Sequence, residues 1–144
     1  MPAPQKVLEL VQLFDRNAAE YRAPDFKEAN VRVQFIDPLF KVLGWDMENE
    51  RGYAEAYKEV IHEASLKIKG ATKAPDYCFR IGSTPKFYLE AKKPAVNIKD
   101  DPAPALQLRR YAWTAKLPLS ILTDFEEFAV YDGRCCGTTS KSVL

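Results

Sequence analysis

Two short strand-like segments joined by a turn constrain the fold of this chain more than any other feature. Residues 76–81 and 86–92 are rich in aromatic and aliphatic side chains, and the segment between them, Gly-Ser-Thr-Pro, has turn composition. The pattern predicts an antiparallel hairpin. Because alternate side chains of a strand point to the same side, Glu90 and Lys92 should share one face of the second strand.

The length of the hairpin loop decides whether Asp76 joins Glu90. Opposed residues of an antiparallel pair share a face, so the two carboxylates meet only if the loop has an odd number of residues. A four-residue loop would pair Asp76 with Ala91, and a β-bulge would then be needed to restore the phase. If the two carboxylates meet, they can bind Mg2+. The alternative is that the charged residues of the hairpin face the solvent and bind no metal. Both interpretations stay open at this point.

An acidic residue two positions before a lysine is a common pattern on its own. It occurs at Asp25 and Lys27 as well as at Glu90 and Lys92. Asp25 falls where we expect a helix to begin, and aspartate is a frequent N-cap. Glu90 instead ends a predicted strand, so the context favours Glu90 and Lys92 as the functional pair.

Length and composition indicate one domain of ordinary globular type. A chain of 144 residues buries roughly two-thirds of its unfolded surface and needs no disulfides to fold. The three cysteines show no metal-ligand spacing. No apolar run is long enough for a transmembrane helix or typical of a signal peptide, so we expect a cytoplasmic protein without a membrane partner.

The charge balance limits how this chain could bind nucleic acid. Lys and Arg number 21 against 20 Asp and Glu, for a formal net charge of +1. Lys and Arg contacts to phosphates supply most non-specific affinity for a polyanion. Strong autonomous binding is therefore not expected, and any nucleic-acid face must be local.

The remaining elements predict an α/β fold. Apolar spacing indicates helices over 7–21 and from about 25 to 44, the second bent or divided by Pro38, and a helix over 105–116 opened by Pro104. Segments 57–69, 119–122 and 128–131 read as strands, the first with a bulge or turn at 63–65. Segments 46–55 and 94–104 read as loops, and 133–144 as a frayed tail. We expect three layers, with a central mixed β-sheet of about four to five strands flanked by helices.

The helix after the hairpin carries Gln107 and Tyr111 four positions apart, on one face. Together with Asp76 and the Glu90-Ala91-Lys92 run, this order of motifs resembles the PD-(D/E)xK nuclease domains of restriction enzymes and RecB-like nucleases, in the Q-x-x-x-Y subgroup. Residues 28–46 are also similar to the stretch that precedes the catalytic core in type I and type IIG restriction proteins. The resemblance covers about residues 25–131.

The resemblance implies a restriction-endonuclease-like fold and a metal site. Asp76, Glu90 and the backbone carbonyl of Ala91 would bind Mg2+, with Mn2+ as a substitute. It also implies that Glu28 points into the site, although an exposed first-turn glutamate is an equally good interpretation. Lys92 would orient or deprotonate the attacking water. Because an ordinary lysine is protonated at neutral pH, we expect it rather to stabilise the charge on the scissile phosphate.

Four residues of the third helix complete the predicted site. Gln107 and Tyr111 resemble a pair that contacts the nucleic-acid backbone or the water network near the metal. Arg109 and Arg110 would add phosphate contacts from neighbouring faces of the helix. In each case ordinary helix composition is the simpler alternative.

The function implied is that of a Mg2+-dependent DNA endonuclease domain of a restriction system, which leaves 5′-phosphate and 3′-hydroxyl ends. Residues 1–144 would form a single nuclease domain, excised from the N-terminus of a larger restriction-modification protein. Its partners would be double-stranded DNA and methyltransferase and specificity domains or subunits, and dimerisation on DNA is a hypothesis. The alternatives are a non-cleaving DNA-binding or assembly module with the same fold and, more distantly, a structural interaction domain.

Overall fold

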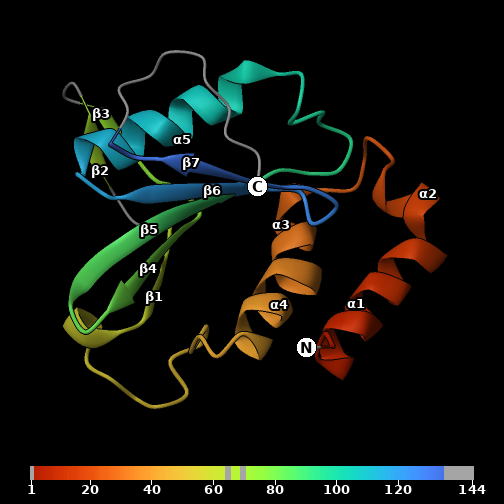
Figure 1. The fold of residues 1–144 in the computed structure, drawn as a ribbon, viewed down its shortest axis with the longest axis horizontal. Coiled ribbons are helices and arrows are strands. Elements are labelled where there is room, and N and C mark those ends of the chain that lie inside the picture. Colours follow the sequence, from red (N-terminus) through yellow and green to blue (C-terminus); the bar gives the residue numbers. More distant parts are fainter. Residues whose placement is uncertain (1, 64–65, 69–70, 135–144) are drawn as a thin grey trace.

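The computed structural model describes residues 2–63, 66–68 and 71–134, and it has the three layers expected of an α/β domain (Figure 1). Within these residues a five-stranded sheet has the order β1-β4-β5-β6-β7. The strands are β1 (Val60–His62), β4 (Tyr77–Ile81), β5 (Thr84–Ala91), β6 (Leu119–Thr123) and β7 (Phe128–Asp132). Only β5 and β6 pair in parallel, so the sheet is mixed, as predicted.

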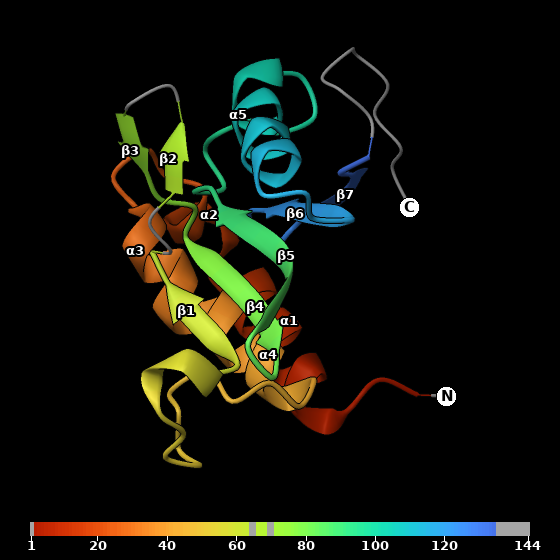
Figure 2. The ribbon, with the colours of Figure 1, turned by 90° about the vertical axis from the view of Figure 1, so that its left-hand side faces the viewer.

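Helices cover both faces of this sheet (Figure 2). One face is covered by the helices from the N-terminal part of the chain. These are α1 (Gln5–Arg16), α2 (Ala18–Tyr21), α3 (Glu28–Val31), the π-helical turn η1 (Arg32–Ile36) and α4 (Asp37–Val42). The opposite side holds α5 (Pro102–Thr114), which connects the parallel strands β5 and β6. A short 3-10 turn, η2 (Glu55–Tyr57), begins at the last residue of the predicted loop and ends at the first residue of the segment predicted as a strand.

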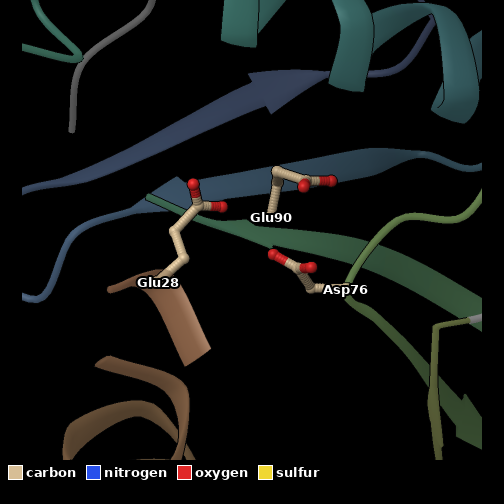
Figure 3. Close-up of side chains that lie close together, drawn as sticks. All are labelled: Glu28, Asp76 and Glu90. Carbon is tan, nitrogen blue, oxygen red and sulfur yellow. The ribbon is translucent and has the colours of Figure 1, made fainter. Parts of the chain in front are cut away.

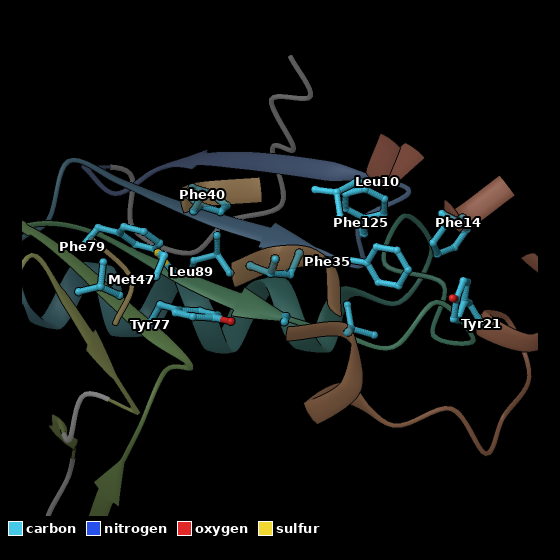
Figure 4. Packing of buried hydrophobic residues seen from close by; sticks show 14 of the residues in the cluster. Leu10, Phe14, Tyr21, Phe35, Phe40, Met47, Tyr77, Phe79, Leu89 and Phe125 are labelled. Atoms are coloured by element: carbon cyan, nitrogen blue, oxygen red, sulfur yellow. The ribbon is translucent and has the colours of Figure 1, made fainter. Parts of the chain in front are cut away.

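The alternation of side chains along the strands divides the core in two. Tyr77 and Leu89 belong to a cluster with the N-terminal helices, where rings such as Phe35 pack closely (Figure 4). Cys78 and Tyr88, one position along each strand, belong to a second cluster with α5. The strands are therefore buried on both faces, which explains why they read as nearly continuous apolar runs.

The second predicted helix is real but is built from three pieces. Its expected cap, Asp25, is exposed in a turn, and the helix begins at Glu28 after Lys27. Pro38 stands in the first turn of α4, just after the π turn. Because proline has no backbone N–H to donate, the helix changes its hydrogen-bonding pattern at this point, so Pro38 divides the helix, one of the two expected effects.

Three other expectations need correction. The segment 57–69 is divided by a turn at Glu63, one of the two breaks expected there, but its two parts join different sheets: β1 joins the main sheet, while β2 (Leu66–Ile68) pairs with the unpredicted β3 (Ala71–Lys73). The helix predicted at 105 begins at Pro102, because the Asp101 side chain caps it by accepting the Ala103 N–H. The helix predicted over 7–21 breaks at Asn17.

Two further expectations concern the ends and the surroundings of the chain. The frayed tail expected over 133–144 lies outside the described residues from 135 onward. Among the residues that are described, no helix has the length and apolar character needed to cross a membrane.

Candidate active site

A β-bulge brings the two predicted carboxylates to the same face. Ile81 pairs with Thr84, so the hairpin loop has only two residues, and that even number alone would misalign Asp76 and Glu90. Between Phe79 and Arg80 the register shifts by one residue, because Lys86 is an extra residue on β5. Continuing the shifted register one step past Tyr77 and Leu89 places Asp76 opposite Glu90. The predicted requirement is therefore met by a bulge.

Glu28 joins the two strand carboxylates from the start of α3. Figure 3 shows its side chain reaching from the helix toward the strands that carry Asp76 and Glu90. One carboxylate oxygen from each of the three residues lies within 4.8 Å of the others. Lys93 helps to place the helix, because its Nζ donates to the Pro24 carbonyl oxygen at 2.8 Å, tying the segment before α3 to the end of β5.

Of the three carboxyl groups, that of Glu90 lies where a negative charge is least favourable. Its Oε2 is buried and has no hydrogen-bond partner within the described part of the chain. Burial raises the pKa of Glu90 to about 8, with a further contribution from the Asp76 carboxylate and a smaller opposing effect of Lys92. A buried carboxylate oxygen without a donor, next to two more carboxylates, suits a hard divalent cation, which prefers oxygen ligands.

Asp76 and Glu28 each form an ion pair with a neighbouring cation. The Arg32 Nη1 lies 3.5 Å from Asp76 Oδ1, and the Lys92 Nζ lies 3.6 Å from Glu28 Oε1. The other oxygen of Asp76 accepts the Ala91 N–H at 2.8 Å. Lys92 therefore lies beside the carboxylates, and the Ala91 contact is made by its backbone N–H rather than by the carbonyl expected as a metal ligand.

Three polar residues of this region were not identified from the sequence. Arg32 contacts Asp76, its guanidinium lies 5.0 Å above the Tyr77 ring, and the Tyr77 hydroxyl donates to Asp37 at 2.5 Å. One signal was available, since Arg32 follows Glu28 by four residues and so shares its helix face. Nothing in the local pattern indicated Tyr77 or Asp37.

The predicted nucleic-acid contacts on α5 occupy different environments. Gln107 is exposed and donates through Nε2 to the hydroxyl of the buried Tyr111 at 2.5 Å. Arg110 is exposed, but Arg109 is only 7% exposed and its guanidinium lies 5.8 Å from the Tyr131 ring centre. The two arginines do not form one basic surface. The apolar spacing of Ala105, Leu108 and Ala112 places position 109 on the buried stripe, which the sequence could have indicated.

Two comparisons relate the chain to known proteins. Residues 58–134 match the family described as the N terminus of the type I restriction enzyme R protein. The chain is also 45% identical over 129 residues to the type II restriction enzyme and methyltransferase RM.Eco57I of Escherichia coli. That match covers 86% of this chain but only 13% of the relative. No solved structure matches the chain.

Proposed function

Because the chain belongs to the family of type I restriction enzyme R protein N termini, we propose that it is a Mg2+-dependent DNA endonuclease domain of a restriction system. The products would carry 5′-phosphate and 3′-hydroxyl ends. One observation carries the proposal: Glu28, Asp76 and Glu90 bring carboxylate oxygens within 4.8 Å of one another, beside Lys92.

The donor set fits a hard cation. Glu28, Asp76 and Glu90 would hold Mg2+ through side-chain oxygens, with the Ala91 carbonyl as a further ligand and Mn2+ as a substitute. The orphaned Oε2 of Glu90 supports this assignment, because a bound cation would satisfy it. When bound, the metal would polarise a phosphate oxygen and make a coordinated water more acidic.

The protein's own groups would position the substrate and balance charge. Lys92 would contact the scissile phosphate and stabilise the negative charge that develops there, and its Nζ lies 3.6 Å from Glu28 Oε1 in the cluster. Gln107 would offer its exposed amide to the nucleic-acid backbone, oriented by its hydrogen bond to Tyr111. Arg110 would add a phosphate contact. Arg109 would need to leave its buried position to do the same.

Plasmid cleavage tests the assignment. We expect the wild type to cut with Mg2+ or Mn2+, and Asp76→Asn and Lys92→Ala to cut at least about 100-fold more slowly. Matched controls are Asp25→Asn, in the exposed turn that repeats the acidic pattern, and Lys41→Ala, an exposed lysine on α4. Both should cut like the wild type.

A wild type that fails to cut with either metal at high concentration would refute the proposal. So would equal cleavage by the Asp76 and Lys92 variants. Duplex binding without cleavage would favour the alternative of a non-cleaving DNA-binding or assembly module.

The partners follow from the same proposal. The chain spans 13% of a relative whose name joins restriction and methyltransferase activities, so we propose that attached methyltransferase and specificity domains or subunits direct it to double-stranded DNA in the cytoplasm. Cutting both strands would require two such sites, and dimerisation on DNA would supply them. Light scattering with and without a duplex should show the increase in mass.

A further inference from the structure

Arg32 touches the carboxylate cluster, although the proposed reaction assigns it no role. Its Nη1 lies 3.5 Å from both Asp76 Oδ1 and Glu63 Oε1, and its guanidinium lies over the Tyr77 ring. The side chain is only 18% exposed, so these contacts are largely shielded from water. A partly buried arginine that faces a predicted metal ligand is well placed to orient that ligand.

The π turn provides the geometry for this contact. The Asp37 N–H donates to the Arg32 carbonyl oxygen, five residues back, instead of four as in an α-helix. Residues five apart on an α-helix point about 140° away from each other, and the smaller rotation per residue in the wider π turn reduces this angle. Arg32 and Asp37 can therefore both reach Tyr77, one above its ring and one at its hydroxyl.

Asp76 is consequently held at both of its oxygens. Oδ2 accepts the Ala91 N–H, and Oδ1 faces Arg32. Arg32 is held in turn by Tyr77, and Tyr77 by Asp37 at the other end of the π turn. Three carboxylates within 4.8 Å repel one another, so such fixation is needed to keep them converged before a cation arrives.

We propose that Arg32 is a positioning residue for the Asp76 carboxylate in the metal site, and that the π turn Arg32–Ile36 sets its orientation. This inference rests on the proposed function, because it takes Glu28, Asp76 and Glu90 to bind a divalent cation.

Two roles for Arg32 predict opposite results. If Arg32 were only a counter-charge for the carboxylates, its removal would make the site more negative and Mn2+ would bind more tightly. If Arg32 positions Asp76, its removal lets the carboxylate turn away and Mn2+ binds more weakly. Residues that orient metal ligands typically change metal affinity by about 10–100-fold when replaced.

The test is calorimetric titration of Mn2+ into the full chain without DNA. We expect Arg32→Gln to weaken Mn2+ binding by at least about 10-fold. Arg51→Gln is the matched control, because it removes the same charge from an exposed arginine that pairs with Glu59. The Arg51 variant should bind Mn2+ within about twofold of the wild type, since screening weakens distant surface charges.

Two further variants separate positioning from packing. Arg32→Lys keeps the charge and one donor, so it should bind Mn2+ more tightly than Arg32→Gln. Tyr77→Phe keeps the ring under Arg32 but loses the hydroxyl that contacts Asp37, and it should weaken Mn2+ binding by a few-fold. Cleavage by Arg32→Gln should recover at high Mn2+, with the metal requirement raised and the maximal rate retained.

Unchanged or tighter Mn2+ binding by a folded Arg32→Gln would overturn the positioning role while leaving the proposed nuclease intact. Equal affinity of the Lys and Gln variants would also overturn it. If Arg32→Gln does not fold, Tyr77→Phe decides the matter, because unchanged Mn2+ binding by this variant would overturn the positioning role. A wild type that binds no Mn2+ would overturn both proposals.

Discussion

Glu90 illustrates at the residue scale how a proposed function and stability conflict. Its carboxyl group is buried next to Asp76, one of its oxygens has no donor among the described residues, and its pKa is raised to about 8. Each of these features disfavours the charged form in the metal-free protein. A bound cation would lower the pKa of Glu90, because it stabilises the ionised form that burial disfavours.

Replacement of Glu90 by Gln should therefore stabilise the metal-free protein while removing Mn2+ binding. At pH 8.5 we expect the free energy of unfolding to rise by roughly 1–2 kcal/mol, because a buried charge is replaced by a neutral amide. Urea unfolding and Mn2+ titration measure the two effects. Glu48→Gln, at an exposed glutamate, is the control and should change neither. A destabilised Glu90→Gln that still binds Mn2+ would contradict this interpretation.

Asp124 predicts a pH dependence that is independent of the carboxylate cluster. It lies in the turn between β6 and β7, where its carboxylate accepts the Glu127 N–H at 2.8 Å. Burial, partly opposed by this hydrogen bond, raises the pKa of Asp124 from 3.8 to about 6, and the carboxylates of Glu126 and Glu127 add to the rise.

The folded state thus binds the Asp124 proton more tightly than the unfolded state. The stabilisation from this group is complete below about pH 4 and is lost as the pH rises to about 6. Asp124→Asn cannot ionise, so it does not lose this stabilisation as the pH rises. The free energy of unfolding of the variant, relative to that of the wild type, should therefore increase between pH 4 and 7 by at most about 3 kcal/mol. Urea unfolding across this range measures it, with the exposed Asp25→Asn as control. An advantage that does not change with pH would argue against the raised pKa.

At the scale of elements, two irregularities build the site. The bulge at Lys86 aligns Asp76 with Glu90, and the π turn η1 directs Arg32 and Asp37 to the same tyrosine. Both are one-residue departures from regular geometry. π turns and bulges are frequent next to functional sites because each redirects side chains without disrupting the rest of the element.

Deletion of Val33 tests the π turn directly. Val33 is 68% exposed, so its loss removes little core packing, but it should convert the π turn to an α turn. The residues before it would then rotate by about 100° relative to those after it, and the joint contact of Arg32 and Asp37 with Tyr77 would be lost. We expect Mn2+ binding to fall by at least about 10-fold, with helical circular dichroism retained. Val33→Ala is the control, and unchanged binding by the deletion variant would count against the role of the turn.

At the scale of the whole molecule, charge limits what the chain can do alone. The formal net charge is +1, and Arg109, one of the predicted phosphate contacts, is buried. Non-specific DNA affinity depends on the number of phosphates neutralised, so the isolated chain should bind weakly.

Fluorescence anisotropy with a duplex and the Asp76→Asn variant, which should not cut, measures this affinity. We expect a Kd above about 1 µM at physiological salt, weakening further as salt rises. Nanomolar binding would contradict the expectation and indicate that attached domains are not needed for delivery to DNA.

Much of the fold could be predicted because local sequence patterns indicate most of the helices and strands. Alternation and turn composition located β4, β5, β6 and β7, and apolar spacing located the main helices. Helix and strand ends were less accurate, because caps such as Asp101 depend on a single hydrogen bond. The short β2 and β3 pair was missed as a pair since three residues carry too little periodicity to identify a strand.

The sequence by itself determined which groups are available and which faces of the strands they occupy. An odd number of residues separates Asp76 from Glu90, which allows them to oppose each other, and Lys92 shares the face of Glu90. Only the tertiary structure decided that a bulge satisfies this condition, that Glu28 comes within reach, that Arg32 holds Asp76 and that Arg109 is buried. The physical reason is that periodicity is a local property, whereas contacts between segments distant in the chain depend on how whole elements pack.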